Sequence, residues 1–309
     1  MPDNIIRIAT RSSKLALWQA EHIKSLIETT SPEVSVEIVH VKTIGDRNQT
    51  DALREFGGTG VFTREVQHSV LKRETDIAVH SLKDLPTLES SGLKLAGIPD
   101  RAPHFDALLL PNGRIIETLD ELPKSARIGT GSPRRQAQLL HSRPDLQMLE
   151  IRGNVDTRIR KLDEGEFDAI ILAEAGLRRL GLEDRISLVL KPPLVYPAVG
   201  QGAIGVECRE DDLLAQEVLQ KLTNKDVLAA VTAERSLLAE LRAGCHAPLG
   251  ALTILEGNRL SLCGILLSLD GVIRLEAEAS GTIDEASKLG VTVAESLLEN
   301  GGDKLVEAF

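Results

Sequence analysis

The sequence is poor in aromatic residues, with five Phe, one Trp and one Tyr among 309 residues. Proteins that bind single-stranded nucleic acids stack the bases on aromatic side chains, and nucleic-acid-binding domains carry an excess of Lys and Arg. Here 36 Lys and Arg stand against 46 Asp and Glu, and the net charge is −10. The composition therefore argues against nucleic acid as a partner.

Long apolar runs and cysteines are also scarce. No apolar run approaches the ~18–20 residues that a membrane-spanning helix needs, and residues 1–10 lack the basic and then apolar order of a secretory signal. Three cysteines are too few for a disulfide framework in a chain of this length. We therefore expect a cytoplasmic protein that makes no membrane contact.

Motifs for nucleotides and metal ions are missing as well. The chain contains neither the phosphate-binding pattern Gly-x-x-x-x-Gly-Lys-Ser/Thr nor the dinucleotide-binding pattern Gly-x-Gly-x-x-Gly. Its seven His residues show no metal-ligand spacing, and no Cys-x-x-Cys pair occurs. We therefore expect neither a nucleotide cofactor nor a metal ion.

Alternating strand and helix patterns fill the first two thirds of the chain. Residues 5–9 form a short apolar run, and the stretch that follows has an apolar helical face made by Ala16, Ala20, Ile23 and Ile27. Further strands and helices are predicted at residues 34–41, 61–71, 76–80, 128, 134–141, 147–151, 155–163 and 169–173. Because strands that alternate with helices form parallel sheets covered on both faces, the predicted fold class is α/β.

Two short sequence echoes indicate two similar lobes in this region. Residues 7–12 (RIATRS) resemble residues 127–132 (RIGTGS), and residues 74–79 (ETDIAV) resemble residues 166–171 (EFDAII). The two echoes occur in the same order along the chain. Lobes of this kind usually face each other across a cleft and bind ligands at the carboxyl ends of their strands.

The last third of the chain has a different character. Gly257-Asn258 and Asp270-Gly271 are hairpin signals between strand-like segments, and a helical pattern follows them. This part is predicted to be a small antiparallel α+β domain. Residues 191–197 contain three prolines and are interpreted as a hinge or crossover.

Positive charge gathers between residues 127 and 161, although the chain as a whole is acidic. This stretch has eight basic and three acidic residues, an excess of five positive charges. The basic residues are Arg127, Arg134, Arg135, Arg143, Arg152, Arg158, Arg160 and Lys161. Several lie where a predicted strand ends or a helix begins, and guanidinium and free backbone N–H groups favour carboxylates or phosphates there. We expect an anion site, although any single arginine could instead lie on a solvated helix face.

Asp84 and Cys245 are the other candidates for chemistry. Asp84 lies in the turn after a predicted strand, where a carboxylate beside Lys83 could move protons or stabilise a cationic intermediate; the alternative is a turn-forming Asp. Cys245 lies in a Gly-Cys-His loop, where a thiol could act as a nucleophile or covalent anchor, or have no special role. Cys208 and Cys263 lie in apolar, strand-like surroundings and are interpreted as core residues.

Taken together, these segments resemble the porphobilinogen deaminase (hydroxymethylbilane synthase) family. The resemblance runs from residues 8–11 (IATR) to at least Pro248. The matching segments are VHSLKDLP at 79–86, RGNV with TR at 152–158, AGL with RLG at 175–181, PAVGQGA at 197–203 and the loop Gly244-Cys245-x-x-Pro248.

The resemblance implies two lobes like those of periplasmic binding proteins, and a small C-terminal α+β domain with a three-stranded antiparallel sheet. The first lobe would comprise residues 1–101 and 198–222, and the second, with an arginine-rich cleft face, residues 102–197. Residues 223–309 would form the C-terminal domain that carries the cysteine loop.

The resemblance also implies a transferase of tetrapyrrole and haem biosynthesis. It would join porphobilinogen units head to tail with release of ammonia, and release the linear tetrapyrrole hydroxymethylbilane by hydrolysis. A dipyrromethane cofactor, built from substrate, would be attached covalently to Cys245 through a thioether. We expect the small molecule porphobilinogen as partner, no nucleic acid or membrane, and a monomer.

Residue roles follow from the resemblance position by position. Asp84 would be the catalytic residue, which pairs with pyrrole N–H groups and stabilises the cation that forms as ammonia leaves. Each pyrrole unit carries an acetate and a propionate, and these need basic partners. The expected cofactor-binding residues are Lys83, Asp84, Thr130, Ser132, Arg134, Arg135, Gly176 and Cys245. The expected substrate-binding residues are Arg11, Ser13, Arg152, Arg158, Arg179 and Gln201, and no metal ligand is expected.

Some positions depart from the family pattern. Thr59 and Glu55 stand where the family usually has lysines, and residues 103–107 (PHFDA) replace the usual Asp-Pro-Arg-Asp-Ala. Further replacements are Gly131 for Ser, Pro133 for Leu and Ala243 for Gly. Two other functions remain open at this point: a non-catalytic, two-lobed anion-binding protein, and a thiol hydrolase that uses Cys245 and His246.

Overall fold

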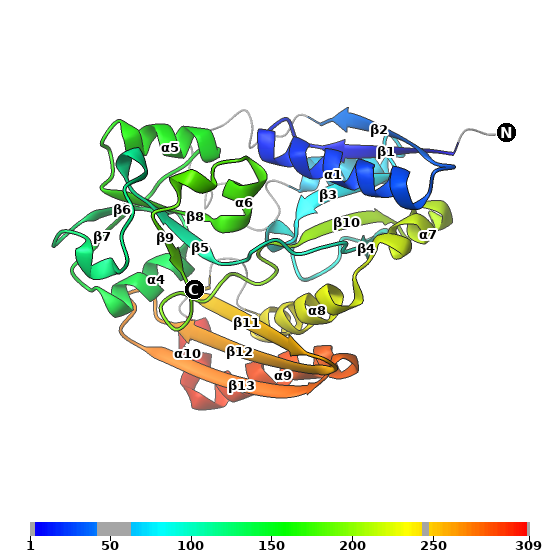
Figure 1. Cartoon of the computed structure of the whole chain (residues 1–309). Helices are drawn as coiled ribbons and strands as arrows, with labels where there is room; N and C mark the ends of the chain where they lie inside the picture. The colour runs from blue at the N-terminus through cyan, green and yellow to red at the C-terminus, as the bar shows by residue number, and fades with distance from the viewer. Residues whose placement is uncertain (1–3, 42–62, 243–246, 308–309) are drawn as a thin grey trace. The chain divides into compact units, whose positions relative to one another are not determined.

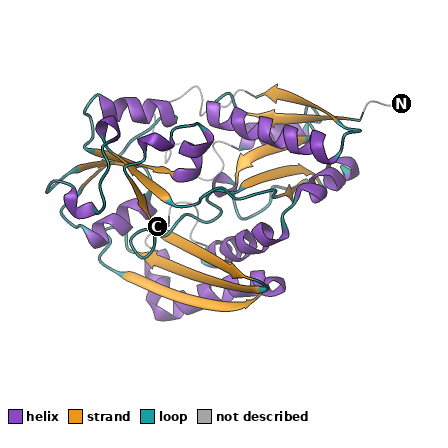
Figure 2. Cartoon of the chain, viewed as in Figure 1, coloured by secondary structure: helices purple, strands orange, loops and turns teal. Residues whose placement is uncertain are grey.

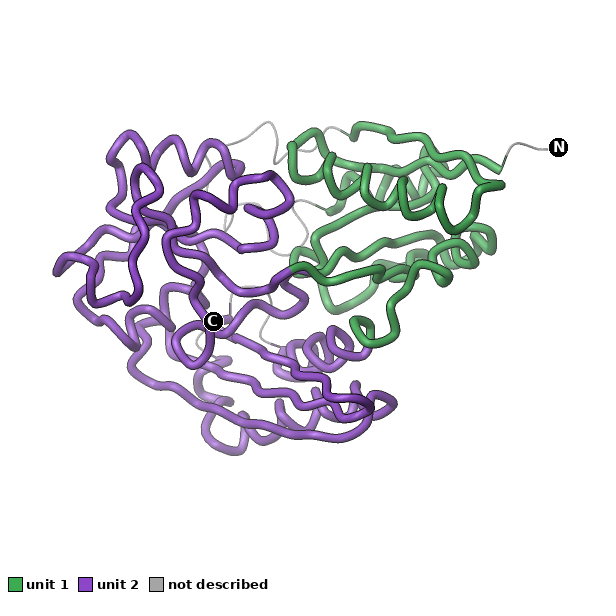
Figure 3. The backbone as a smooth tube through the Cα atoms, in the orientation of Figure 1, with its two compact units in different colours: residues 1–102, 203–228 green, residues 103–202, 229–309 purple. Residues whose placement is uncertain are grey.

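The computed structural model describes residues 4–41, 63–242 and 247–307 (Figure 1). The chain divides into two compact units, each made of two segments (Figure 3). The first unit comprises residues 1–102 and 203–228, and the second comprises residues 103–202 and 229–309. In the described residues, no helix is both long and apolar enough to cross a membrane.

The first unit contains a five-stranded sheet in the order β2-β1-β3-β10-β4. The strands are β1 (Ile5–Thr10), β2 (Ser35–His40), β3 (Ile77–Ser81), β4 (Leu93–Gly97) and β10 (Ile204–Arg209). β1 pairs in parallel with β2 and β3, whereas β10 runs antiparallel to both β3 and β4. The helices are α1 (Lys14–Thr30), α3 (Arg64–Leu71), α7 (Leu213–Leu222) and the short η2 (Leu82–Asp84). We call this sheet with its helices lobe 1.

The helices of lobe 1 pack through the apolar faces that the sequence predicts. Ala20, Ile23 and Ile27 of α1 are fully buried, and they join β1, β3, β10 and α7 in one apolar cluster. α1 begins at an N-cap, Ser13, whose hydroxyl accepts a hydrogen bond from the backbone N–H of Ala16 at 3.3 Å. This cap fixes the turn between the end of β1 and the first residue of α1.

The second unit contains another five-stranded sheet, in the order β7-β6-β8-β5-β9. Its strands are β5 (Asp106–Leu109), β6 (Arg127–Gly129), β7 (Gln147–Leu149), β8 (Ala169–Ala173) and β9 (Leu188–Leu190). Its helices are α4 (Pro133–Ser142), α5 (Val155–Asp163) and α6 (Glu174–Arg179), with short helices η3 (Pro111–Gly113), η4 (Leu119–Glu121) and η5 (Glu183–Arg185). We call this part lobe 2.

The two lobes have the same strand topology. In lobe 2, β6 pairs in parallel with β7 and β8, and β5 runs antiparallel to both β8 and β9. β6, β7, β8, β5 and β9 therefore correspond to β1, β2, β3, β10 and β4. The predicted pair of similar α/β lobes is confirmed. The short antiparallel strands of both sheets were not predicted.

An Arg–Asp ion pair of the same type occurs in both lobes, and it explains the two short sequence echoes. In lobe 1, Asp76 accepts hydrogen bonds from the backbone N–H of Arg7 at 2.9 Å and from its guanidinium at 3.0 and 3.1 Å. In lobe 2, Asp168 accepts the equivalent bonds from Arg127 at 2.7, 3.2 and 2.9 Å. The pair joins β1 to the start of β3 in lobe 1, and β6 to the start of β8 in lobe 2.

The second unit also holds a three-stranded antiparallel sheet, in the order β11-β12-β13 (Figure 2). Its strands are β11 (Leu249–Glu256), β12 (Arg259–Leu267) and β13 (Arg274–Thr282), and the predicted hairpin turns connect them. The helices are α8 (Lys225–Glu240), η6 (Ile283–Glu285), α9 (Ala286–Leu297), a π-helical turn η7 (Leu298–Gly302) and α10 (Asp303–Val306). This sheet confirms the predicted C-terminal α+β fold. The division into three domains, with its boundaries, stays a prediction.

Candidate active site

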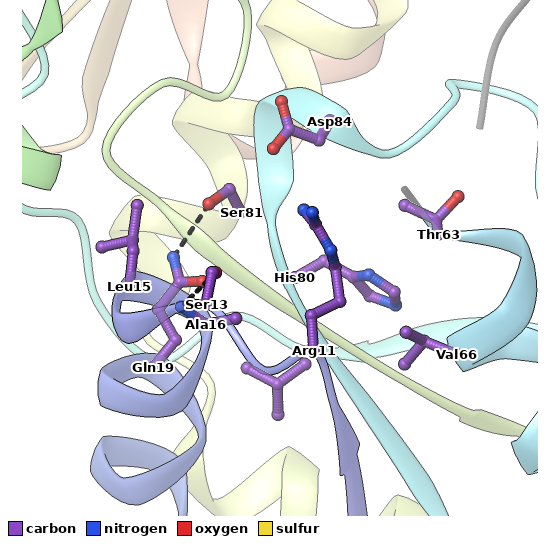
Figure 4. Close-up of a pocket in the computed structure, with 11 residues that line it drawn as sticks. Arg11, Ser13, Leu15, Ala16, Gln19, Thr63, Val66, His80, Ser81 and Asp84 are labelled. Carbon is purple, nitrogen blue, oxygen red and sulfur yellow. Dashed lines mark hydrogen bonds between the residues drawn. The ribbon is translucent and has the colours of Figure 1, made fainter. Parts of the chain in front are cut away.

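A pocket lies in lobe 1 at the carboxyl ends of the parallel strands β1 and β3 (Figure 4). It has an empty volume of about 470 Å³ that opens to solvent. The residues that line it are Arg11, Ser13, Leu15, Ala16, Gln19, Thr63, Val66, Val79, His80, Ser81 and Asp84. The structure thus brings together three predicted site residues, Arg11, Ser13 and Asp84.

Local backbone structure places these residues around the pocket. Arg11 and Ser13 form the turn from β1 into α1, and Asp84 ends the short helix η2 that follows β3. η2 is anchored by Leu82, which is buried and whose backbone N–H donates to the Ala203 carbonyl at 3.0 Å. Asp84 itself is exposed. A buried residue thus fixes the turn that presents an exposed carboxylate to the pocket.

The pocket is lined by groups of opposite charge, the guanidinium of Arg11 and the carboxylate of Asp84. Figure 4 shows the guanidinium of Arg11 pointing toward the carboxylate of Asp84. Lys83 is half-buried in the same turn. On the α1 side, the Gln19 side-chain amide donates to the Ser81 hydroxyl at 2.9 Å. The arrangement offers cations for a carboxylate and one anion for a group that becomes positive.

A buried polar group, of which His80 lines the pocket, was not predicted. The Nε2 atom of His80 lies 3.1 Å from Oε2 of Glu207, and both side chains are about 5% exposed. The Gln67 amide donates to both carboxylate oxygens of Glu207, at 3.1 and 2.9 Å. The available signal in the sequence was a glutamate inside the otherwise apolar segment Ile-Gly-Val-Glu-Cys.

The two adjacent arginines of lobe 2 meet an internal carboxylate. Arg134 donates from Nη1 to Asp106 at 2.7 Å and to the Tyr196 carbonyl at 2.5 Å. Arg135 donates from Nε and Nη2 to Asp106 at 2.9 and 2.7 Å, and from Nη1 to the Ile171 carbonyl at 3.0 Å. Asp106 is fully buried and the arginines nearly so. Two guanidinium groups on one carboxylate leave one positive charge in excess.

Burial affects the ionisation of this group. Desolvation lowers the pKa of Arg134 below its ordinary value, and the nearby charge of Asp106 counteracts this effect. The predicted residue Gln201 belongs to the same group, because its side-chain amide donates to Asp106 at 3.0 Å and to the His104 carbonyl at 2.8 Å. The chain that leads to β10 is thereby tied to the start of β5.

The remaining predicted residues of lobe 2 lie at strand ends and helix starts. Thr130 is buried after β6, and its hydroxyl accepts from the Ser132 backbone N–H at 3.2 Å. Gly176 is buried in α6. Three arginines have identified partners: Arg152 pairs with Glu150, Arg158 donates to the Gly153 carbonyl at 2.7 Å, and Arg179 donates to the Gly202 carbonyl at 2.8 Å. These contacts orient the side chains at the ends of the lobe 2 strands.

Comparison with known proteins identifies the family. A family model described as porphobilinogen deaminase, dipyromethane cofactor binding domain, matches residues 6–217. A second, described as porphobilinogen deaminase, C-terminal domain, matches residues 228–299. The chain belongs to the porphobilinogen deaminase family.

Similar proteins cover nearly the whole chain. A porphobilinogen deaminase of Pelobacter propionicus is 45% identical over 99% of this chain and 98% of its own length. A porphobilinogen deaminase of Geobacter sulfurreducens is 46% identical over 98% of this chain and 94% of its own length. The solved methionine-binding protein MetQ has a TM-score of 0.46 and 13% identity, covering 75% of this chain and 95% of that chain.

Several positions that the sequence analysis singled out lie outside the described residues. They are Cys245 and His246 of the cysteine loop, Ala243 before it, and Glu55 and Thr59. The other two cysteines are described: Cys208 is buried and Cys263 is half-buried. Burial raises the pKa of each of these thiols to about 11, so neither is a thiolate at neutral pH.

The described residues contain no cluster of three or more His, Cys, Asp or Glu side chains that could hold a metal ion. The predicted site residues that the structure describes in this deaminase family member fall into two groups. One surrounds Asp84 in lobe 1, and the other consists mostly of arginines in lobe 2.

Proposed function

We propose that the protein joins porphobilinogen units head to tail with release of ammonia, and releases hydroxymethylbilane by hydrolysis. This is a transferase reaction of tetrapyrrole and haem biosynthesis. The main support for this activity is the match to porphobilinogen deaminases at about 45% identity over nearly the full chain. A bound dipyrromethane cofactor goes with it, because one matching family model is that of a cofactor-binding domain.

The donor groups present suit a polycarboxylate cofactor. Its acetate and propionate groups need cationic partners, and Arg135 with Arg134 keeps one positive charge in excess beside Asp106. Lys83, Thr130, Ser132 and Gly176 would hold it as further binding residues, and Cys245 would anchor it through a thioether. When bound, the cofactor supplies the free pyrrole carbon to which the first substrate unit is joined.

Asp84 is the catalytic residue in this proposal. As ammonia leaves with the electron pair of the C–N bond, the remaining methylene carbon and pyrrole ring become positive. An exposed carboxylate at the mouth of the pocket stabilises that charge and accepts a hydrogen bond from the pyrrole N–H. Arg11, whose guanidinium points toward Asp84 (Figure 4), orients the carboxylate.

Substrate carboxylates bind to cationic and polar groups at the strand ends of both lobes. The proposed residues are Arg11, Ser13, Arg152, Arg158, Arg179 and Gln201. Guanidinium groups suit this task because their planar donors match a carboxylate. The backbone carbonyl contacts of Arg158 and Arg179 restrict these side chains before substrate binds.

The mass of the intact protein tests the proposal. We expect an excess over the sequence mass equal to a dipyrromethane, absent in Cys245→Ser, and conversion of porphobilinogen to a tetrapyrrole with release of ammonia. An unmodified mass together with normal turnover would contradict the covalent anchor. A protein that binds porphobilinogen without releasing ammonia would instead be the non-catalytic anion-binding protein, which the family match does not favour.

The thiol hydrolase alternative requires His246 as a base. The deaminase proposal gives His246 no chemical role, so His246→Ala should retain tetrapyrrole synthesis. We also propose that the protein acts as a cytoplasmic monomer without nucleic acid, and that it has three domains: residues 1–101 with 198–222, residues 102–197, and residues 223–309.

A further inference from the structure

The buried group of Gln67, His80 and Glu207 has no counterpart in lobe 2. In lobe 1, the strand register pairs His80 with Gly205 and Glu207 with Ala78. In lobe 2, the same register pairs Leu172 with Ala107 and Leu109 with Ile170. His80 and Glu207 therefore occupy the positions of Leu172 and Leu109.

The helical member of the group also has an apolar equivalent. α3 and α5 each end five residues before the aspartate of the Arg–Asp pair. Counting back nine residues from Asp76 gives Gln67, and counting back nine residues from Asp168 gives Ile159. Ile159, Leu109 and Leu172 belong to one apolar cluster in lobe 2.

The comparison shows that this fold does not need polar residues at these three positions. A buried carboxylate is costly unless it is paired and hydrogen-bonded, and well-packed apolar residues often replace buried ion pairs without loss of stability. Lobe 2 contains that apolar solution. In lobe 1, one of the three residues, His80, lines the pocket that Asp84 also lines.

The contacts orient the imidazole of His80. Its Nε2 is buried and lies 3.1 Å from Oε2 of Glu207, an ion-pair contact without hydrogen-bond geometry, and the Gln67 amide donates to the same carboxylate. Because Nε2 lies against Glu207 and His80 lines the pocket, Nδ1 is the ring nitrogen left for the pocket. A carboxylate beside one ring nitrogen of a histidine, with the other nitrogen as proton acceptor, is a common arrangement for a general base.

We propose that His80 is the proton acceptor of the pyrrole-joining step, and that Glu207 and Gln67 are its positioning residues; this rests on the proposed function. When the α-carbon of one ring bonds to the methylene carbon of the next, that α-carbon must lose its proton. The C–H bond breaks, its electron pair restores the aromatic ring, and the proton goes to Nδ1. His80 then returns the proton to solvent through the open pocket. Asp84 keeps its separate role at the C–N bond.

The test replaces the polar group with the residues of lobe 2. Gln67→Ile, His80→Leu and Glu207→Leu together should leave the thermal unfolding temperature near that of the wild type, while turnover falls by about 100-fold or more. His80→Gln alone should show the same loss. Thr75→Val is the matched control, because its hydroxyl donates to Ser69 on α3 in another buried polar contact; this variant should keep wild-type turnover. Turnover is expressed per molecule that carries the cofactor mass.

Two further measurements distinguish proton transfer from a structural role. With porphobilinogen deuterated at its free α-carbon, His80→Gln should show a larger primary isotope effect than the wild type. Independently of activity, ¹⁵N NMR of the wild-type histidines should show His80 protonated at Nε2, and Glu207→Leu should lose that signature. Wild-type turnover in His80→Gln, or slow turnover with an unchanged isotope effect, would overturn the assignment. A wild type that makes no tetrapyrrole would instead refute the proposed function.

Discussion

Lobe 1 and lobe 2 share one sheet topology but distribute their charges differently. In each lobe an Arg–Asp pair connects two neighbouring parallel strands, β1 and β3 in lobe 1 and β6 and β8 in lobe 2. Lobe 1 places the buried acid Glu207 beside the pocket-lining His80, whereas lobe 2 uses Asp106 to hold two arginines. In the strand register, Asp106 corresponds to Ile204 of lobe 1. The differences mark where each lobe departs from what the shared fold requires.

The largest expected effect is a loss of activity when the carboxylate of Asp84 in lobe 1 is removed. Asp84→Ala should lower the rate of ammonia release by about 1,000-fold, a loss of about 4 kcal/mol of transition-state stabilisation, because the developing cation loses its carboxylate. Folding should be unaffected, since Asp84 is exposed. Steady-state ammonia release with porphobilinogen measures the effect. Asp163→Ala, which removes a carboxylate that pairs with Arg185 in lobe 2, is the control and should turn over normally. Normal turnover in Asp84→Ala would make Asp84 an ordinary turn residue.

The next effect concerns the stability of lobe 2. Asp106→Asn removes the charge that compensates two buried arginines, and breaking a buried pair of this kind costs about 3–5 kcal/mol. Urea unfolding measures the change. Asp120→Asn is the control, because Asp120 is an exposed acid 3.9 Å from Arg143 and should change stability by less than about 0.5 kcal/mol. Equal stability of the two variants would mean that the charge of Asp106 does not hold Arg134 and Arg135.

Sequence patterns predicted the repeated framework well, for a physical reason. The Arg–Asp pair recurs on matching strands, and the same residues therefore recur in the sequence. The apolar face of α1 is visible for a similar reason, because Ala20, Ile23 and Ile27 follow the helical period. Short strands such as β5 were missed, because their pairing partners are distant in the chain.

The environment of the candidate site was harder to predict. Arg134 and Arg135 were expected to bind an external anion, but the sequence contains no sign that Asp106, 28 residues earlier, already contacts Arg134. The contact between His80 and Glu207 likewise depends on β10, which returns to lobe 1 from far along the chain. The roles of Arg134 and Arg135 in cofactor binding stay predictions.

A smaller difference is expected between the two Arg–Asp pairs. Asp76 is more buried than Asp168 and also accepts a hydrogen bond from Arg209 at 3.2 Å. Asp76→Asn should therefore cost about 2 kcal/mol, and Asp168→Asn less than about 1 kcal/mol. Urea unfolding at neutral pH measures both values. Equal costs would show that neither burial nor Arg209 strengthens the lobe 1 pair.

The acid dependence of these variants follows from the pKa directions. Burial raises the pKa of Asp76, but hydrogen bonds from Arg7 and Arg209 outweigh this and lower it overall. The hydrogen bond from Arg127 lowers the pKa of Asp168. Stabilisation by a carboxyl with a lowered folded pKa is complete above its unfolded pKa of about 3.9 and is lost as the pH falls through the folded pKa. The stability gap between the wild type and either variant should therefore narrow below about pH 4.

The last effect tests packing at equivalent strand positions. Ala9 is fully buried in lobe 1, and its equivalent in lobe 2 is Gly129. A Cβ at residue 129 would lie 2.9 Å from Cδ1 of Phe167, where lobe 1 has the smaller Thr75. Gly129→Ala should cost about 1–2 kcal/mol through overpacking, and less in a Phe167→Thr background. A double-mutant cycle by urea unfolding measures the coupling. If the cost were the same in both backgrounds, Phe167 would not be the reason that lobe 2 requires glycine where lobe 1 has alanine.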